Sequence, residues 1–226
     1  MRATRQKDFR EAREKGEATW SGEEKTEGHW RVPDPEVVSL MSEWSPPRGL
    51  TAYDLGCGLG RHTLFLFQRG FRVYASDIAM SALRQCSNWL TREGFPSLLT
   101  RNDLTTIPYL DESFDFVLAF YTIYHARLGD MQKCLQEIHR TLRANGRVLV
   151  NLRTDRDSAC GKGVKIEERT FAVPEHGQKD VIHHFCSEGE VGDLFRGFRI
   201  LKRERGERKR EGGDTASHWI VLATKM

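Results

Sequence analysis

The chain has 226 residues, of which 38% are hydrophobic and 10% aromatic, and its formal net charge is +3 at neutral pH. This is enough apolar material for one folded domain and excludes a chain that is disordered throughout. The small net charge gives no reason to expect nucleic acid as a partner. No apolar stretch reaches 18 residues and the five cysteines form no CxxC spacing. We therefore expect no membrane span, no signal peptide, no disulfide framework, no metal site and a cytoplasmic location.

The first part of the chain differs from the rest in its charge density. Residues 1–28 carry seven basic and seven acidic side chains and few apolar ones. We predict an N-terminal arm and first helix over residues 1–45, acting as a lid or cap, and a second domain over 46–226. The first helix is expected to begin near Pro35 and to end before Pro46. We expect Trp20 and Trp30 either to close over a ligand as part of a lid or to pack against this helix, and both alternatives stay open.

Apolar strand patterns and amphipathic helix patterns alternate from residue 50 to residue 152. The expected strands lie at 50–55, 71–76, 97–101, 114–120 and 147–152, and the expected helices at 61–69, 79–93 and 129–142. Such alternation predicts a parallel sheet covered by helices on both faces.

After Leu152 the alternation stops. The pattern predicts a polar insert at 153–186 with short strands at 166–172 and 181–186, then a short helix at 188–195. Two final strands, at 198–205 and 218–225, have no helix between them and should pair antiparallel. The loop between them lies in a stretch, 199–213, with seven basic and three acidic residues, which indicates a solvated loop or a surface for an anionic partner.

Glycines at 56, 58 and 60 separate the first strand from the next helix. Glycines there let the backbone turn sharply and approach a ligand, and the helix N-terminus offers free N–H groups. The fingerprint of dinucleotide-binding proteins needs its third glycine at position 61, which is Arg61 in this chain. The spacing therefore argues against a dehydrogenase.

Two carboxylates accompany the glycines. Asp54 precedes the loop by two residues, where a carboxylate can orient the loop and face a cationic ammonium group. Asp77 ends the second strand, 21 residues after Gly56, where an acid can accept hydrogen bonds from ribose hydroxyls. This acidity disfavours phosphate and favours an unphosphorylated nucleoside. The structural alternatives are a plain tight turn at Gly56–Gly60 and a helix N-cap at Asp77.

The segment Asp54–Gly60 (DLGCGLG) resembles the first motif of class I S-adenosylmethionine-dependent methyltransferases. Asp77-Ile78, Asn102–Leu104 and Phe114–Ala119 resemble further motifs of that family, and Leu142–Gly146 differs from its usual turn in two residues. The resemblance implies a Rossmann-like, doubly wound α/β sheet of seven strands, mostly parallel with an antiparallel C-terminal strand. Within the family, the chain looks most like the tellurite-resistance and thiopurine-type enzymes for small molecules.

The resemblance implies S-adenosyl-L-methionine as cofactor and in-line displacement at its sulfonium methyl group. The implied cofactor-binding residues are Asp54, Gly56, Cys57, Gly58, Gly60, Arg61, Asp77, Ile78, Asp103, Leu104, Phe120 and Tyr121.

The predicted catalytic residues are Tyr121, His125 and His184. The first two follow the fourth strand, at the edge of the sheet where open α/β proteins bind ligands. Adjacent residues of a strand point to opposite faces, so at most one of His183 and His184 is expected to face a site. Ordinary packing or a surface position remains the alternative for each of them.

Four functions are compatible with these residues in different degrees. We expect a methyltransferase for a small-molecule acceptor. A methyltransferase for RNA or protein is the alternative that the basic stretch supports, and a non-catalytic protein that binds S-adenosylmethionine ranks third. A dehydrogenase ranks last because of the glycine spacing. The sequence does not indicate the acceptor atom or the oligomeric state.

Overall fold

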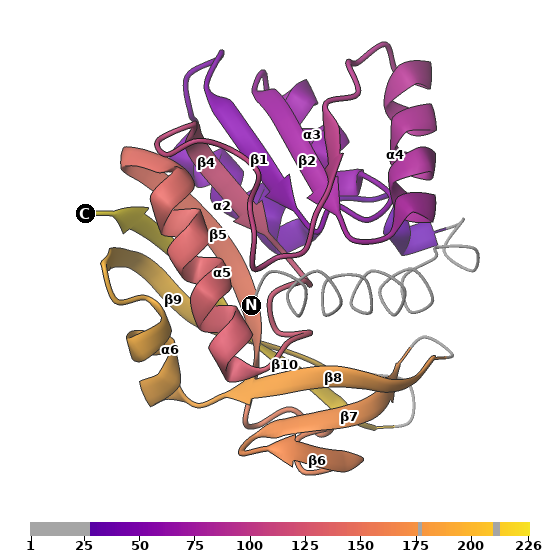
Figure 1. Ribbon diagram of the computed structural model, residues 1–226, viewed down its shortest axis with the longest axis vertical. Helices are drawn as coiled ribbons and strands as arrows, with labels where there is room; N and C mark the ends of the chain where they lie inside the picture. The colour runs from indigo at the N-terminus through magenta and orange to yellow at the C-terminus, as the bar shows by residue number, and fades with distance from the viewer. Residues whose placement is uncertain (1–27, 176–177, 210–212) are drawn as a thin grey trace, which may run out of the picture. The chain divides into compact units, whose positions relative to one another are not determined.

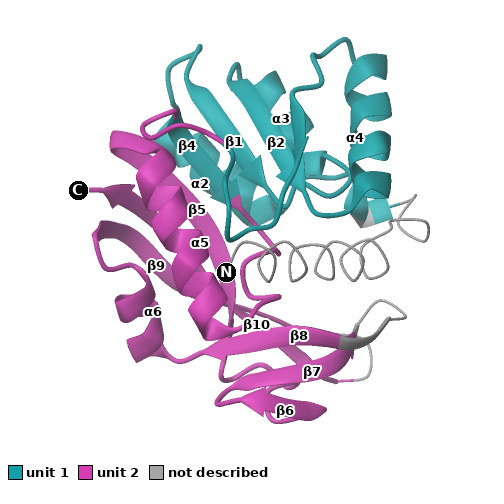
Figure 2. Cartoon of the chain, viewed as in Figure 1, with its two compact units in different colours: residues 1–108, 114–118 teal, residues 109–113, 119–226 magenta. Residues whose placement is uncertain are grey.

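The computed structural model describes residues 28–175, 178–209 and 213–226. The chain divides into two compact units, shown in Figure 2: residues 1–108 with 114–118 form unit 1, and residues 109–113 with 119–226 form unit 2. Most of the predicted N-terminal arm, Trp20 included, lies outside the described residues. Among the described helices, none combines the length and the apolar character that crossing a membrane requires.

The described residues of unit 1 form four parallel strands and three α-helices. Figure 1 shows their arrangement. The elements in chain order are η1 (Gly28–Trp30), α2 (Pro35–Trp44), β1 (Thr51–Leu55), α3 (Arg61–Gln68), β2 (Arg72–Asp77), α4 (Met80–Arg92), β3 (Leu99–Arg101) and β4 (Phe114–Ala119). Within this unit the strand order is β3-β2-β1-β4. The last residue of β4 already belongs to unit 2.

Strands β1 and β4 of unit 1 are mostly buried and apolar, as strands covered on both faces require. Tyr53 of β1 and Phe116 of β4 are fully buried, and the Tyr53 ring stacks on Phe114 with centroids 4.9 Å apart. Helix α2 begins where Asp34 accepts the Glu36 N–H. Strands β1 and β2 run parallel, so their carboxyl ends, and the loops that follow them, lie at the same edge of the sheet.

Unit 2 contains two antiparallel systems. Its elements are α5 (Leu128–Thr141), β5 (Leu142–Thr154), β6 (Val164–Glu167), β7 (Thr170–Glu175), β8 (Gln178–Cys186), α6 (Glu188–Leu194), β9 (Phe198–Lys209) and β10 (Thr215–Lys225). Strand β10 pairs antiparallel with both β5 and β9. Strands β6, β7 and β8 form an antiparallel meander, and the end of β8 runs parallel to the end of β5.

The predicted fold class is confirmed: the chain has a Rossmann-like α/β fold whose first strands are parallel and whose C-terminal strands are antiparallel. The described residues form ten strands, however, instead of the predicted seven. Two local predictions are wrong. The insert has three strands instead of two, because Arg169 adopts a left-handed φ of 54° and turns β6 into β7. The predicted strand at 198–205 continues to Lys209 as β9, because β10 pairs with it that far, so part of the predicted basic loop is strand.

Candidate functional site

The loop after β1 is held by its own backbone. Gly56 N and Cys57 N both donate to the carbonyl of Ser76 at the end of β2, each at 2.8 Å. The glycines at 56, 58 and 60 have φ angles of 74°, 53° and 94°. Residues other than glycine rarely adopt this backbone conformation. The loop therefore has a fixed shape that depends on glycine at these positions.

Gly60 is restricted by space as well as by its φ angle. It is the N-cap of α3, and a Cβ atom placed on it would lie 2.5 Å from Sγ of Cys86 on α4. The Cys86 thiol is also hydrogen-bonded to the Cys57 thiol. This hydrogen bond, together with burial, raises the pKa of Cys57 well above its usual value. The two buried thiols thus pack the glycine loop against α4.

Asp77 links the glycine loop to the start of α4. Its Oδ2 accepts the Gly58 N–H and its Oδ1 accepts the Ala79 N–H, each at 2.9 Å. A carboxylate has about four lone-pair directions, so it can accept more than two hydrogen bonds, including those of hydroxyl groups. The N-cap of α4 is Ala79 and has no side-chain cap, so the predicted N-cap role of Asp77 is wrong; its contact with Ala79 stabilises the turn that leads into the helix.

Asp54 is buried in the same region. Its side chain accepts the Thr63 hydroxyl at 2.6 Å from the first turn of α3. Burial raises the pKa of Asp54 from 3.8 to about 7, although the Thr63 hydrogen bond and the charge of Arg61 lower it. A nearby cation would favour the ionised form of this carboxyl group. Asp54 therefore combines a structural contact with sensitivity to a positively charged ligand.

A polar turn follows β3. Asp103 Oδ1 accepts from the backbone N–H and the hydroxyl of Thr105, at 2.8 and 2.6 Å. The buried Asn102 accepts the Tyr53 hydroxyl and donates to the Asp103 carbonyl. The carbonyl of Ile78 accepts from Arg101 Nε at 2.8 Å. These contacts fix the backbone of both turns that follow β2 and β3.

In unit 2, aromatic and imidazole rings gather near the ends of β5, β8 and β10. We call this set the ring cluster; its members are Tyr121, Tyr124, His125, His183 and His218. The centroid distances are 4.4 Å for Tyr124 and His125, 4.7 Å for His125 and His183, and 5.4 Å for Tyr121 and His218. Tyr121, His125 and His218 are half-buried residues, whereas Tyr124 and His183 are buried.

Tyr121 has a strained backbone, with a φ angle of 60°. Its N–H donates to the side chain of the buried Asn151 on β5, and this hydrogen bond stabilises the unusual conformation. Non-glycine residues in this region concentrate at functional sites.

A buried guanidinium supports the ring cluster. Arg153 Nη1 lies 3.2 Å from His183 Nδ1, and Arg153 Nε lies 3.8 Å from Asp157 Oδ2. Because arginine only donates hydrogen bonds, His183 Nδ1 must accept, and neutral His183 carries its proton on Nε2. The Arg153 guanidinium also lies 5.7 Å from the Tyr124 ring, which places a fixed positive charge beside the cluster.

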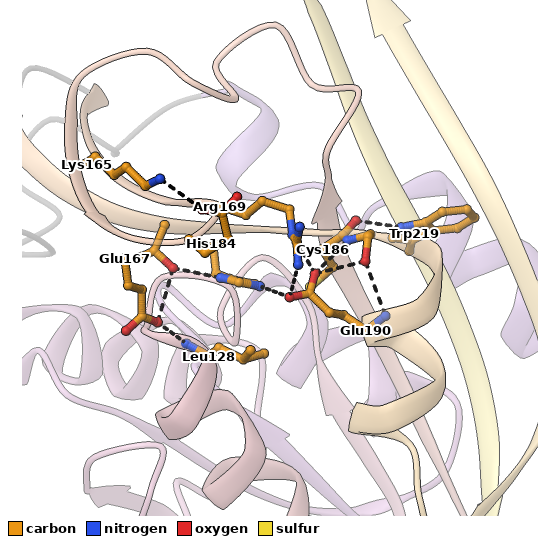
Figure 3. A network of polar contacts seen from close by, with 11 residues as sticks. Leu128, Lys165, Glu167, Arg169, His184, Cys186, Glu190 and Trp219 are labelled. Carbon is orange, nitrogen blue, oxygen red and sulfur yellow. Dashed lines mark hydrogen bonds and ion pairs between the residues drawn. The ribbon is translucent and has the colours of Figure 1, made fainter.

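His184 points to the other side of β8 and belongs to a separate polar network, drawn in Figure 3. Its Nδ1 lies 2.7 Å from the Thr170 hydroxyl, and its Nε2 lies 3.6 Å from Glu190, which also forms two hydrogen bonds with Arg169. Burial lowers the pKa of His184. Burial raises the pKa of Glu190, but Arg169, Ser187 and His184 outweigh that effect and lower it.

The same network connects the insert to two helices. Glu167 accepts the Leu128 N–H at the start of α5, and Glu190 forms a capping box with Ser187 at the start of α6. These contacts give the network a clear structural role in unit 2.

The comparisons with known proteins agree with this geometry. Residues 53–150 match the family model described as a methyltransferase domain. This match identifies residues 53–150 as a methyltransferase domain, and the motifs in this segment resemble those of the class I S-adenosylmethionine-dependent type.

One curated relative is a malonyl-[acyl-carrier protein] O-methyltransferase from Halorhodospira halophila, 30% identical over 145 residues that cover 62% of this chain and 44% of the relative. The chain matches less than half the length of the first curated relatives.

Two solved structures show the same fold. A SAM-dependent methyltransferase from Methanosarcina mazei aligns with a TM-score of 0.69 and 19% identity, over 86% of this chain and 99% of the other. The 1,6-didemethyltoxoflavin-N1-methyltransferase from Burkholderia thailandensis, a complex with S-adenosylhomocysteine, aligns with a TM-score of 0.68 and 18% identity, over 95% and 87% of the two chains.

Most of the residues predicted to bind the cofactor lie together in the unit 1 part of the methyltransferase domain, and Phe120 and Tyr121 lie in unit 2. Of the predicted catalytic residues, Tyr121 and His125 are in the ring cluster, whereas His184 is in the network of Figure 3. The expectation that the His183-His184 pair points to opposite faces fits the structure, and His183 is the member that joins the ring cluster.

Sequence reasoning missed the roles of Asn151, Arg153 and His218. One signal was present: β5 and β10 are adjacent antiparallel strands, and their register places His218 opposite Arg153. These three residues can be found when the polar residues of neighbouring strands are compared with one another instead of strand by strand.

Proposed function

We propose that the chain is an enzyme that transfers a methyl group from S-adenosyl-L-methionine to a small-molecule acceptor. The observation that carries the proposal is the contact of Asp77 with both Gly58 and Ala79, which joins the glycine loop to a carboxylate suited to ribose hydroxyls. Asp54 supports it, because its buried carboxyl group is sensitive to a cation such as the ammonium of the methionine part.

The cofactor-binding roles are assigned as the resemblance implies. Asp77 accepts from the ribose and Asp103 accepts from the adenine amino group. Ile78 flanks the adenine ring, and the backbone N–H of Leu104 faces it. Gly56, Cys57, Gly58, Gly60 and Arg61 form the loop beside the methionine part, with Asp54, and Phe120 and Tyr121 complete the set.

The reaction follows from the cofactor. A lone pair of the acceptor forms a bond to the methyl carbon while the carbon–sulfur bond breaks and its electron pair stays on sulfur. Holding the reactants in line supplies most of the catalysis, at an upper limit of roughly 7–11 kcal/mol. A general base is needed only where the acceptor must lose a proton, and we assign that role to His125.

We propose that the ring cluster binds the acceptor. Its half-buried rings, Tyr121, His125 and His218, offer flat apolar surface with polar edges, which suits a small unsaturated molecule. The names of two relatives assign them acceptors of limited size, a malonyl group on a carrier protein and a didemethyltoxoflavin. His184 is buried and contacts Thr170 instead of these rings. We therefore propose that it stabilises β8 and does not take part in the reaction.

RNA or protein as acceptor has less support. Of the basic residues on β9, three form ion pairs with neighbouring acids: Lys202 with Glu204, Arg203 with Glu188 and Arg205 with Glu207. This neutralises much of the charge that an anionic partner would need. We therefore propose no nucleic-acid partner, and a cytoplasmic location stays a prediction.

Calorimetric titration tests the cofactor assignment. We expect S-adenosylmethionine and S-adenosylhomocysteine to bind the wild type, and Asp77→Ala to weaken both by at least about 100-fold, or about 3 kcal/mol. Asp111→Ala, at an exposed acid of unit 2, is the matched control. Undiminished binding by Asp77→Ala would falsify the assignment.

Label transfer tests the acceptor. The protein is incubated with methyl-labelled cofactor and separated cell fractions of small metabolites, RNA and protein. We expect label in the metabolite fraction, reduced by His125→Ala. Label confined to RNA or protein contradicts the small-molecule proposal, and binding without any transfer supports a non-catalytic protein.

A further inference from the structure

The segment Gly28–Asp34, which we call the strap, lies against both turns of the cofactor site. Trp30 packs on a cluster of Leu59, Ala79 and Ala82. Leu59 lies inside the glycine loop, and the N–H of Ala79 is one of the two that Asp77 accepts. A single side chain of the strap therefore touches the loop after β1 and the turn after β2.

Two cation–π contacts also connect the strap to helices α3 and α4. The Arg61 guanidinium, from the first residue of α3, lies 5.8 Å from the Trp30 ring. The Arg31 guanidinium lies 4.8 Å from the ring of Trp89 on α4. Cation–π contacts of this kind are attractive, so both contacts stabilise the docked strap.

His62 makes the most specific contact with the strap. Its Nε2 accepts the N–H of Asp34 at 3.1 Å in a buried position. Asp34 in turn accepts the N–H of Glu36 and so caps α2. His62 directly follows Arg61, so one hydrogen bond connects the end of the strap to the first turn of the helix that leaves the glycine loop.

The protonation state of His62 fits this role. Because the Asp34 backbone N–H donates, Nε2 must be unprotonated, and the neutral ring carries its proton on Nδ1. Burial and the charge of Arg61 lower the pKa of His62 well below 6.5, so the ring stays neutral near pH 7. Replacing the imidazole by an apolar side chain would leave the Asp34 N–H buried without this acceptor.

We propose that His62 is a positioning residue that holds the strap against the glycine loop, so that docking of the strap and binding of S-adenosylmethionine stabilise each other. The inference rests on the proposed cofactor site and adds a device that the family motifs do not contain. Binding free energies are reciprocal, so the cofactor must strengthen strap docking by the same factor by which docking strengthens cofactor binding.

The test combines calorimetry with hydrogen exchange of the full chain, using S-adenosylhomocysteine as the probe. His62→Gln keeps an oxygen close to the position of Nε2, whereas His62→Leu removes the acceptor. We expect His62→Leu to weaken binding by about 3- to 10-fold, as a buried hydrogen bond of 0.5–1.5 kcal/mol implies, and His62→Gln to recover most of it. In the wild type, the probe should slow exchange of the amides at 28–34, and His62→Leu should reduce that slowing.

Trp30→Ala gives a second reading in case His62→Leu does not fold. It should also weaken binding, and Trp30→Phe should restore it in part. The proposal is overturned if the probe binds the wild type while exchange at 28–34 is unchanged and the variants bind equally well; the cofactor assignment then stands. If the wild type does not bind the probe, the proposed function fails and the coupling fails with it.

Discussion

In unit 1, the candidate site is built mainly from backbone N–H groups of one short loop and the carboxylates that order them. In unit 2, the ring cluster is built from side chains of three segments, the loop after β4, strand β8 and strand β10, and Arg153 supports it from β5. A site made of backbone depends on conformations that few residues can adopt, whereas a site made of rings depends on shape and tolerates similar rings. Substitutions should therefore have sharper effects in the glycine loop than in the ring cluster.

The largest effect should come from Gly60→Ala. The φ angle of 94° is unfavourable for alanine by about 1–2 kcal/mol, and the new Cβ would lie 2.5 Å from Sγ of Cys86. We expect the free energy of unfolding to fall by about 3 kcal/mol and cofactor binding to be lost. Denaturant unfolding and calorimetry measure the two effects.

The double variant Gly60→Ala/Cys86→Ala separates the two causes. It should remove the contact with the thiol but keep the strained φ angle, so only part of the stability should return. Wild-type stability in Gly60→Ala itself would contradict the contrast between backbone and ring sites.

Arg153→Met should have the next largest effect. The substitution removes the hydrogen bond to His183 and leaves the buried Asp157 without its cationic neighbour. We expect the free energy of unfolding to fall by about 2–3 kcal/mol. This is a small loss for a broken buried ion pair, because Arg153 Nε and Asp157 Oδ2 are 3.8 Å apart. Tyr124→Phe, which keeps the ring, should cost less than about 1 kcal/mol and is the matched control.

A double-mutant cycle with Asp157→Asn identifies the source of the effect. If the two substitutions are additive, Arg153 does not act through Asp157, and its role is confined to His183 and the rings.

The glycine loop was predictable because its information is local. Gly56, Gly58, Gly60 and Asp54 lie within seven consecutive residues, and Asp77 ends the next strand, so the pattern could be recognised in the sequence. The same applies to the helix that starts at Pro35, where Asp34 and the flanking prolines define both ends.

The ring cluster was not predictable in the same way, because it depends on register. His183 and His184 are equivalent in the sequence, and only the pairing of β8 with β7 and β5 decides which ring meets His125. The basic stretch was misread for a related reason: charged residues favour a loop, but pairing with β10 extends β9 to Lys209. Tertiary pairing overrides local preference where strands are long.

A smaller effect is expected on the number of protons released when the cofactor binds beside Asp54. The pKa of Asp54 is raised to about 7, so near pH 7 the carboxyl group is partly protonated. A bound ammonium group favours the carboxylate and lowers this pKa, so binding should release up to about half a proton at pH 7. The release should fade well above pH 7, where Asp54 is already ionised.

Calorimetry at pH 7 in phosphate and in Tris detects this release, because the buffer takes up the proton with a different heat. Asp54→Asn keeps an acceptor for Thr63 and should abolish the buffer dependence. Proton uptake, or a buffer dependence that survives in Asp54→Asn, would show that the cation does not lie beside this carboxyl group.

The smallest effect is expected on the exposed strand β9. Arg208→Glu/Lys209→Glu changes the charge by four units at two exposed residues. Because surface charges contribute little, the free energy of unfolding should change by less than about 0.5 kcal/mol, and label transfer to the metabolite fraction should stay the same. Lys133→Glu/Arg196→Glu, at exposed residues elsewhere in unit 2, makes the same change in net charge and serves as control. A loss of transfer specific to the β9 variant would mean that this strand binds an anionic acceptor, and the ring cluster would no longer suffice to explain acceptor binding.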